Sequence, residues 1–131
     1  MRKYEMTANT KMFFGRKLYQ IRALVNFEDI KAGDLGGYIE KEENLSHNGY
    51  AWVLNNACVF GNALVYGNAR VFDNVLIYGN AEVYGNARIY GDACVCGDAC
   101  VYDDAKIYGN AWICDNRYVC GNTQIYNDIE E

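Results

Sequence analysis

The fold is decided by residues 51–128, which read as thirteen consecutive hexads: AWVLNN ACVFGN ALVYGN ARVFDN VLIYGN AEVYGN ARIYGD ACVCGD ACVYDD AKIYGN AWICDN RYVCGN TQIYND. Val or Ile occupies the third position of every hexad. The first position is mostly Ala, whereas the second and fourth vary or are aromatic, which is the alternation of a short strand with one buried face. The last two positions are mostly Gly-Asn, Gly-Asp or Asp-Asn, which tolerate positive φ and turn the chain.

A period of six residues excludes the two commonest alternatives. It drifts away from the 3.6-residue repeat of an α-helix, and the two-residue hairpin turns of a β-meander require longer alternating strands. A chain that alternates a short strand with a corner instead stacks each coil on the previous one, about 4.8 Å away, with backbone hydrogen bonds between coils. The hexads therefore predict an all-β fold, a single-stranded parallel β-helix.

The hexads resemble the hexapeptide-repeat family, in which an aliphatic residue is followed four places later by a small one. Val65 with Ala69, and Val83 with Ala87, match this pattern. The resemblance implies a left-handed β-helix of triangular cross-section with three hexads per coil, hence about four coils here. The whole chain, above all GDLGGYIEKEENLS at residues 33–46, is similar to a group of small repeat proteins encoded by phages and prophages, which implies a phage context and no agreed activity.

The chain divides near residue 50. Residues 1–50 form the predicted N-terminal β-rich cap, in which MFFGRKLYQIRALVNF at residues 12–27 reads as a hairpin around Gly15. Residues 51–131 form the β-helix. The cap carries eight basic and seven acidic residues (+1), whereas the β-helix carries four basic and ten acidic residues (−6). Repeat folds need such caps because a coil cannot protect its own end.

The composition also excludes several classes of protein. With 12 basic and 17 acidic residues the formal net charge is −5, so direct nucleic-acid binding is not expected. The sequence has neither a long apolar run for a membrane span nor the basic and apolar start of a secretory signal. We therefore expect a protein of the host-cell cytoplasm without a membrane or cofactor.

Residues eighteen apart stack on one face of a three-hexad coil, so the outward side chains can be assigned to faces. The first face combines a column of three cations with a neighbouring aromatic column. This arrangement suits an acidic peptide, a phosphate or stacked bases. It equally suits a sheet without a ligand, in which the cations maintain solubility and prevent pairing with strands of other molecules. The candidate partner-binding residues are Arg70, Arg88, Lys106, Phe72, Tyr90 and Tyr108.

The second face is almost uncharged, which is unusual for a sheet that faces water. An apolar patch running over four coils favours self-association or partner docking. The coil at the C-terminal end lacks a cap, and its open edge favours a closed tail-to-tail dimer. The predicted interface residues of a homo-oligomer, on the face or at this end, are Phe60, Leu76, Tyr78, Cys94, Cys96, Trp112, Cys114 and Ile129.

The cysteines and one arginine raise separate questions. All six cysteines are predicted to point outward, with Cys96 and Cys114 as neighbours in adjacent coils. We expect small apolar thiols in a reducing cytoplasm, with a disulfide and a soft-metal site as the alternatives. Arg117 occupies a position that is Ala in most hexads, where an inward side chain would bury a charge. A local bulge, or a side chain that escapes through the corner, is expected there.

Three functions fit this pattern. The first is a non-enzymatic binding protein that docks a host protein or ribonucleoprotein, such as a CRISPR effector or another defence nuclease complex that it inhibits. The second is a self-assembling structural protein. The third is an acyltransferase, because the hexapeptide-repeat family includes such enzymes, in which a His acts as the general base. The chain has one His, His47, without an interrupting loop or a C-terminal helix. We therefore expect a binding protein without catalytic residues.

Overall fold

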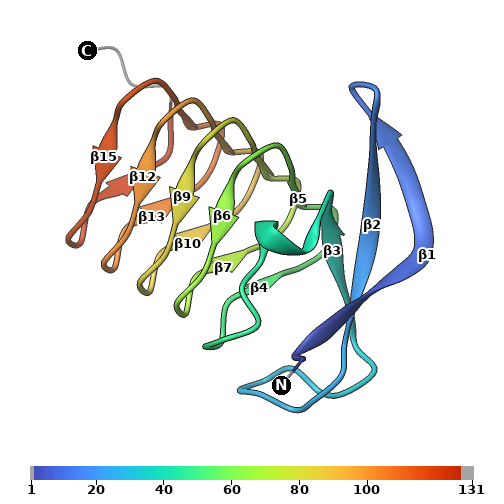
Figure 1. Ribbon diagram of the computed structural model, residues 1–131. Coiled ribbons are helices and arrows are strands. Elements are labelled where there is room, and N and C mark those ends of the chain that lie inside the picture. The colour runs from blue at the N-terminus through green and yellow to red at the C-terminus, as the bar shows by residue number, and fades with distance from the viewer. Residues whose placement is uncertain (1, 128–131) are drawn as a thin grey trace.

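The computed structural model describes residues 2–127 and is built almost entirely from strands (Figure 1). The first strands are β1 (Tyr4–Phe13), β2 (Arg16–Ala23) and β3 (Leu35–Ile39), and a short 3-10 helix, η1 (Glu42–Asn44), follows them. Each hexad then contributes one two-residue strand: β4 (Trp52–Val53), β5 (Cys58–Val59), β6 (Leu64–Val65), β7 (Arg70–Val71), β8 (Leu76–Ile77), β9 (Glu82–Val83), β10 (Arg88–Ile89), β11 (Cys94–Val95), β12 (Cys100–Val101), β13 (Lys106–Ile107), β14 (Trp112–Ile113), β15 (Tyr118–Val119) and β16 (Gln124–Ile125). The predicted all-β fold is confirmed.

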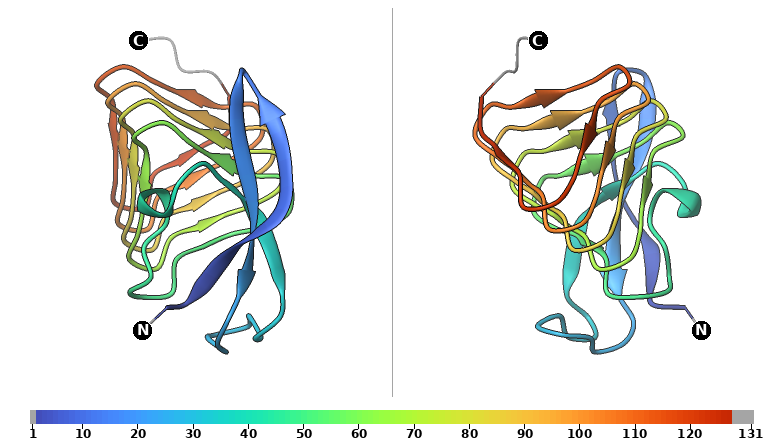
Figure 2. Two further views of the ribbon diagram at one scale, coloured as in Figure 1. Left: turned by 45° about the vertical axis from the view of Figure 1, so that its right-hand side comes forward. Right: turned by 90° about the vertical axis from the view of Figure 1, so that its left-hand side faces the viewer.

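The short strands stack in parallel into three sheets, one per face of the coil (Figure 2). The first face is the sheet β16-β13-β10-β7-β4, the second contains β5-β8-β11-β14, and the third is β15-β12-β9-β6. Strands eighteen residues apart pair, as the hexads predict; the backbone N–H of Cys58, for example, donates to the carbonyl of Val75 at 2.9 Å. The architecture is therefore a parallel β-solenoid.

One more turn precedes the hexads, so the solenoid has about five turns. Tyr38 of β3 pairs in parallel with Cys58, and Leu45 bridges to Val65. Both offsets are twenty residues (58 − 38 and 65 − 45) rather than eighteen, because two extra residues lie between Leu45 and Trp52, where the usual offset of eighteen to Arg70 begins. Residues 38–50 therefore carry no hexad pattern, although their backbone forms the turn that stacks on the N-terminal side of the first hexad coil.

The core is the column of residues at the first and third positions of the hexads. Val59, Val71, Ile89 and Ile107 are fully buried, as are the alanines stacked between them. Arg117 is the departure that the sequence indicated. It is half-buried where Ala99, one coil below, is fully buried, and its strand keeps the register Cys100↔Tyr118. The backbone therefore accommodates Arg117 without a bulge.

The corners turn through residues with positive φ and are tied together by amide ladders. Gly97 has a φ of 63°, and a Cβ there would lie 2.6 Å from the backbone nitrogen of Asp115. At one edge of the second face, Asn62 donates to Asn80 at 3.3 Å, and Asn80 donates to Asp98 at 3.1 Å. Each corner side chain thus satisfies the next one along the solenoid.

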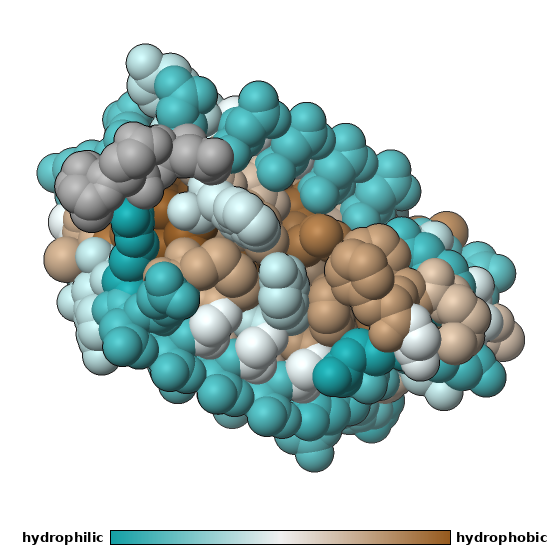
Figure 3. Space-filling model, turned by 90° about the horizontal axis from the view of Figure 1, so that it is seen from above, coloured by the Kyte–Doolittle hydropathy of each residue, from teal (hydrophilic) through white to brown (hydrophobic). Residues whose placement is uncertain are grey.

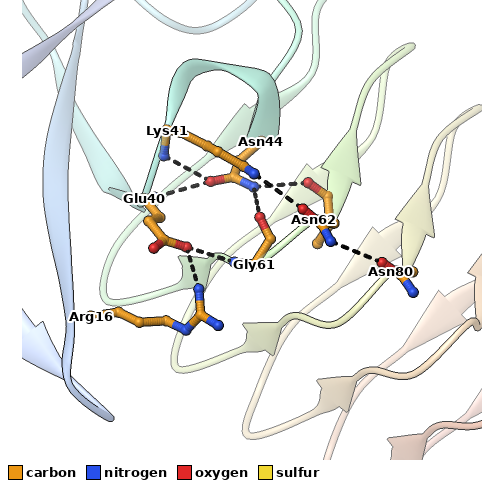
Figure 4. Close-up of polar contacts among 8 residues, drawn as sticks. Arg16, Glu40, Lys41, Asn44, Gly61, Asn62 and Asn80 are labelled. Atoms are coloured by element: carbon orange, nitrogen blue, oxygen red, sulfur yellow. Dashed lines mark hydrogen bonds and ion pairs between the residues drawn. The ribbon is translucent and has the colours of Figure 1, made fainter.

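The N-terminal hairpin of β1 and β2 closes the first turn. β2 pairs with β3, which extends the second-face sheet beyond the solenoid (Figure 1). Asn44 fixes the junction: its buried amide accepts from the backbone of Glu40 and Lys41 and donates to the carbonyls of Gly61 and Ala63 (Figure 4). This one side chain thus bonds to four backbone groups of the junction, including the Glu40 N–H that also donates to the carbonyl of Val59.

Candidate functional site

The cation column on the first face is in register from coil to coil. Arg70 pairs with Arg88, and Arg88 pairs with Lys106, as direct partners in adjacent parallel strands. Side chains at paired positions point to the same face about 4.8 Å apart. Gln124 continues the column after Lys106. The predicted alignment of the three cations is thus present.

Arg70 differs from the other two cations and corrects part of the partner-binding prediction. Its residue is only 8% exposed, and its guanidinium forms ion pairs with Asp29 at 3.0 Å and Glu28 at 3.4 Å. These contacts lower the pKa of the Asp29 carboxyl, chiefly through its hydrogen bond to Arg70. Arg70 therefore anchors the loop before β3 to the solenoid and is not available to a partner.

The sequence pattern could not reveal this contact. The hexads place Arg70 on a face, but residues 24–34 have no repeat that would place Glu28 and Asp29 over it. The same segment contributes Phe27, which packs edge-on against Trp52 with ring centroids 5.3 Å apart. Trp52 is fully buried, although its hexad position is outward. The cap covers the start of the first face.

Arg88 and Lys106 remain exposed, and within residues 2–127 neither forms an ion pair. Two like charges directly opposite one another in a sheet repel. The Arg70 charge one strand below is paired with the acidic loop, whereas Arg88 has only a weaker, longer-range interaction with Asp29 and Lys106 forms no ion pair within residues 2–127. The exposed half of the column is therefore a concentrated positive charge on an otherwise acidic solenoid.

An aromatic ladder runs beside these cations, as predicted. Phe72, Tyr90, Tyr108 and Tyr126 stack with ring centroids 5.0, 5.1 and 5.8 Å apart. The first three rings are half-buried, and Tyr126 is exposed. Stacked rings on consecutive coils form a flat and rigid surface. The accessible part of the first face, hereafter the cationic strip, consists of Arg88, Tyr90, Lys106, Tyr108 and Tyr126.

The second face is partly occupied by the chain itself. Phe60 is only 4% exposed because Phe13 and Leu18 of the hairpin pack on it, with the Phe13 and Phe60 ring centroids 5.8 Å apart. Phe60 is therefore an internal packing residue rather than part of a free interface, which corrects that prediction. The hairpin covers it because β2 extends the same sheet through β3.

Of the other residues predicted at this interface, Cys96 is buried and bonded to Cys114, and four others are at least partly exposed. Leu76, Tyr78 and Cys94 are half-buried, and Trp112 is 54% exposed. Seen from above, apolar side chains form a band between two hydrophilic rims (Figure 3). Ile129, also predicted at the interface, lies outside the described residues.

The cysteines divide into one bonded pair and four free thiols. Cys96 and Cys114 form a disulfide between β11 and β14, so the expectation of free thiols is wrong for this pair. Stacking at a spacing of eighteen residues brings the two Cα atoms to 4.6 Å, within the range of disulfides. Burial raises the pKa of the Cys58, Cys94 and Cys100 thiols, which keeps them protonated at neutral pH. Among residues 2–127 no group of His, Cys, Asp and Glu is arranged to hold a metal ion.

The third face carries a second aromatic ladder, of Tyr66, Tyr84 and Tyr102, whose centroids are 4.8 and 5.1 Å apart. The Tyr66 hydroxyl donates to Glu82 at 2.9 Å. The acidic side chain of this face is therefore engaged within the face.

His47 has partners at both ring nitrogens. Nδ1 accepts the backbone N–H of Lys3 at 3.0 Å, which leaves the proton of the neutral ring on Nε2, 3.1 Å from Glu42. The ring stacks on Tyr4 with centroids 4.1 Å apart. This environment holds the N-terminal strand against the first turn.

A family model described as the YdcK beta solenoid repeat matches residues 65–79 and 81–97. The matched segments run from β6 to β11 in the middle of the solenoid, so the chain is similar to these repeats over that part of its length. No curated protein matches the chain. None of the helices in the described residues is long and apolar enough to cross a membrane.

Proposed function

We propose that the protein is a non-enzymatic binding protein that captures an acidic segment of another protein on the cationic strip. The observation that carries this proposal is the exposed pair of Arg88 and Lys106, which lie in register on adjacent strands and form no ion pair within residues 2–127. A repulsive pair is a cost to the isolated fold, and a ligand that places carboxylates between the two cations removes that cost.

The aromatic ladder supports the same ligand. Tyr90 and Tyr108 directly follow the strands of the two cations and offer apolar ring surface to the aliphatic parts of a peptide. The strip is built on a hydrogen-bonded solenoid, so little conformational entropy is lost when a partner docks. Nucleic acid is the less suitable ligand because its backbone places phosphates along an extended path that several cations must neutralise, whereas the strip offers only Arg88 and Lys106.

The environment of His47 favours a binding role over acyl transfer. A general base needs a free acceptor nitrogen directed at the substrate, whereas His47 Nδ1 is occupied by the Lys3 backbone and Nε2 faces Glu42. The resemblance to small phage and prophage repeat proteins makes a host protein or ribonucleoprotein the proposed source of the acidic segment. Inhibition of a host defence nuclease complex is the corresponding proposed role.

Fluorescence anisotropy with a labelled oligoglutamate peptide tests this proposal. We expect binding that weakens with added salt and falls at least about tenfold in the Arg88→Glu/Lys106→Glu variant. Lys17→Glu, a charge reversal at an exposed site on the hairpin, is the matched control and should leave peptide affinity unchanged.

Two outcomes would contradict the proposal. One is equal affinity of the wild type and the double variant for the peptide. The other is preferential binding of labelled single-stranded DNA, which would place the strip among nucleic-acid surfaces. Circular dichroism of each variant shows whether the solenoid remains folded.

A further inference from the structure

The tip of the N-terminal hairpin carries a side chain that its turn does not favour. Phe13 pairs with Arg16, so Phe14 and Gly15 form a two-residue loop, with φ values of 52° and 75°. Positive φ at both positions is typical of a type I′ turn, which prefers Asn-Gly. A bulky residue at positive φ is strained. Phe14 is nevertheless 77% exposed, so its burial within this chain does not compensate for that strain.

Phe14 stands over the open part of the second face. One hollow on this face is lined by Phe14, by Leu76, Tyr78, Cys94 and Trp112 of the second face, and by the corner residues Asp92 and Asn110. We call Leu76, Tyr78, Cys94 and Trp112 the apolar strip. Trp112 is 54% exposed at the far end of this strip. A single hollow is thus flanked by two exposed large aromatic side chains, Phe14 and Trp112. Exposed apolar patches of this kind mark contact surfaces.

The charges around the apolar strip are opposite at its two ends. Residues 6–27, which include the hairpin tip, contain four basic residues and no acidic ones. Arg16 and Arg22 are ion-paired with Glu40 and Glu5, so the exposed Lys17, which forms no ion pair within residues 2–127, carries the free positive charge beside the tip. Of the four aspartates in residues 89–105, Asp92 and Asp98 flank the second face, whereas Asp103 and Asp104 lie at the corner between the third and the first face. At the β11 level the two rims of the second face carry Asp92 and Asp98, whereas Asn74 and Asn80 hold the same corners one coil below. The strip is therefore basic at the hairpin and acidic toward the last coils.

From this arrangement we infer that the apolar strip is the contact surface of an antiparallel homodimer of this chain. A two-fold axis normal to the strip places the hairpin of one protomer over the last coils of its partner. Phe14 then contacts the region of Trp112 on the other protomer, and the exposed Lys17 approaches the aspartates of the opposite rim. A parallel arrangement would oppose like charges, so the charge distribution selects the antiparallel one.

This dimer does not involve the cationic strip. The apolar strip lies on β8, β11 and β14, whereas the cationic strip lies on β10, β13 and β16 of another sheet. An antiparallel dimer leaves both cationic strips accessible, and two acidic segments can bind at once. The inference stands even if the cationic strip has a different ligand.

Sedimentation equilibrium over a range of concentrations tests the dimer. Phe14→Asn installs the residue that the turn prefers, so the fold should be retained while the dimer dissociation constant rises at least about tenfold. Trp112→Glu should have a similar effect. Tyr118→Glu is the matched control, because Tyr118 occupies the same hexad position on the third face and is 68% exposed.

A second pair of variants tests the orientation. Asp98→Lys should weaken the dimer, because Asp98 lies at a rim of the second face. Asp104→Lys should not, because Asp104 lies at the corner between the third and the first face. The two sites are otherwise matched, since each aspartate accepts from an asparagine one coil below. A monomeric wild type at high concentration would overturn the inference. So would a dimer that persists in Phe14→Asn and Trp112→Glu, since it must use another surface. Equal effects of the two aspartate variants would overturn the antiparallel arrangement.

Discussion

Lys3 shows how one buried charge can anchor the end of the chain. The residue is only 4% exposed, and its ammonium donates to the carbonyls of Ala51 at 2.6 Å and Gly49 at 3.3 Å. The ammonium also lies 5.1 Å from the centroid of the Phe27 ring. Burial, with a smaller contribution from the Arg70 charge, lowers the pKa of Lys3 from 10.5 to about 8. The folded chain therefore binds this proton less tightly than the unfolded chain.

Stability should respond to pH accordingly. Between about pH 8 and 10 the unfolded state retains the Lys3 proton that the folded state has lost, so this residue makes the free energy of unfolding rise with pH. The contribution is on the order of 1–3 kcal/mol. Urea denaturation of wild type and Lys3→Met at several pH values measures it as the difference between the two profiles. A difference that stays constant with pH would contradict the lowered pKa.

At the scale of elements, the hexads predict the position of each short strand and the column of buried Val, Ile and Ala. They do so because the inward-packing residues and the positive-φ corner residues recur at fixed positions in each hexad. The turn before Ala51 was not predicted as part of the solenoid, because its offset of twenty residues hides it from a six-residue pattern. The burial of Trp52 and Arg70 was missed for another reason: it depends on a non-repetitive loop that contacts them across the chain.

The disulfide is a second link between elements, and it ties β14 to β11 across eighteen residues. Closing a loop of this length stabilises a fold by about 3 kcal/mol, mainly by restricting the unfolded chain. We expect Cys114→Ser to lose about 2–3 kcal/mol in denaturant titrations under oxidising conditions and to match the wild type in dithiothreitol. Cys120→Ser, which changes a free thiol in the next hexad, is the control. Equal stabilities of wild type and Cys114→Ser without reductant would show that the bond contributes nothing.

At the scale of the whole molecule, two faces have distinct properties on one rigid solenoid. The sequence predicted an aromatic and cationic face and an apolar face. Both are present, but each has fewer accessible residues than predicted. The cap withdraws Arg70 from the first face, and the hairpin covers Phe60 on the second. Neither of these coverings could be predicted from the sequence, because both depend on how residues 2–37 fold back against the coils. The accessible cations that remain are Arg88 and Lys106.

The most direct test of the binding function is a titration of the ¹⁵N-labelled protein with oligoglutamate, followed by amide chemical shifts. The proposed function predicts that the largest changes fall on β10, β13 and their corners, at Arg88, Tyr90, Lys106 and Tyr108. It also predicts that amides around Tyr66 and Trp112, on the other two faces, remain in place. Changes centred on the apolar strip, or spread evenly over all three faces, would contradict the assignment of the cationic strip as the binding surface.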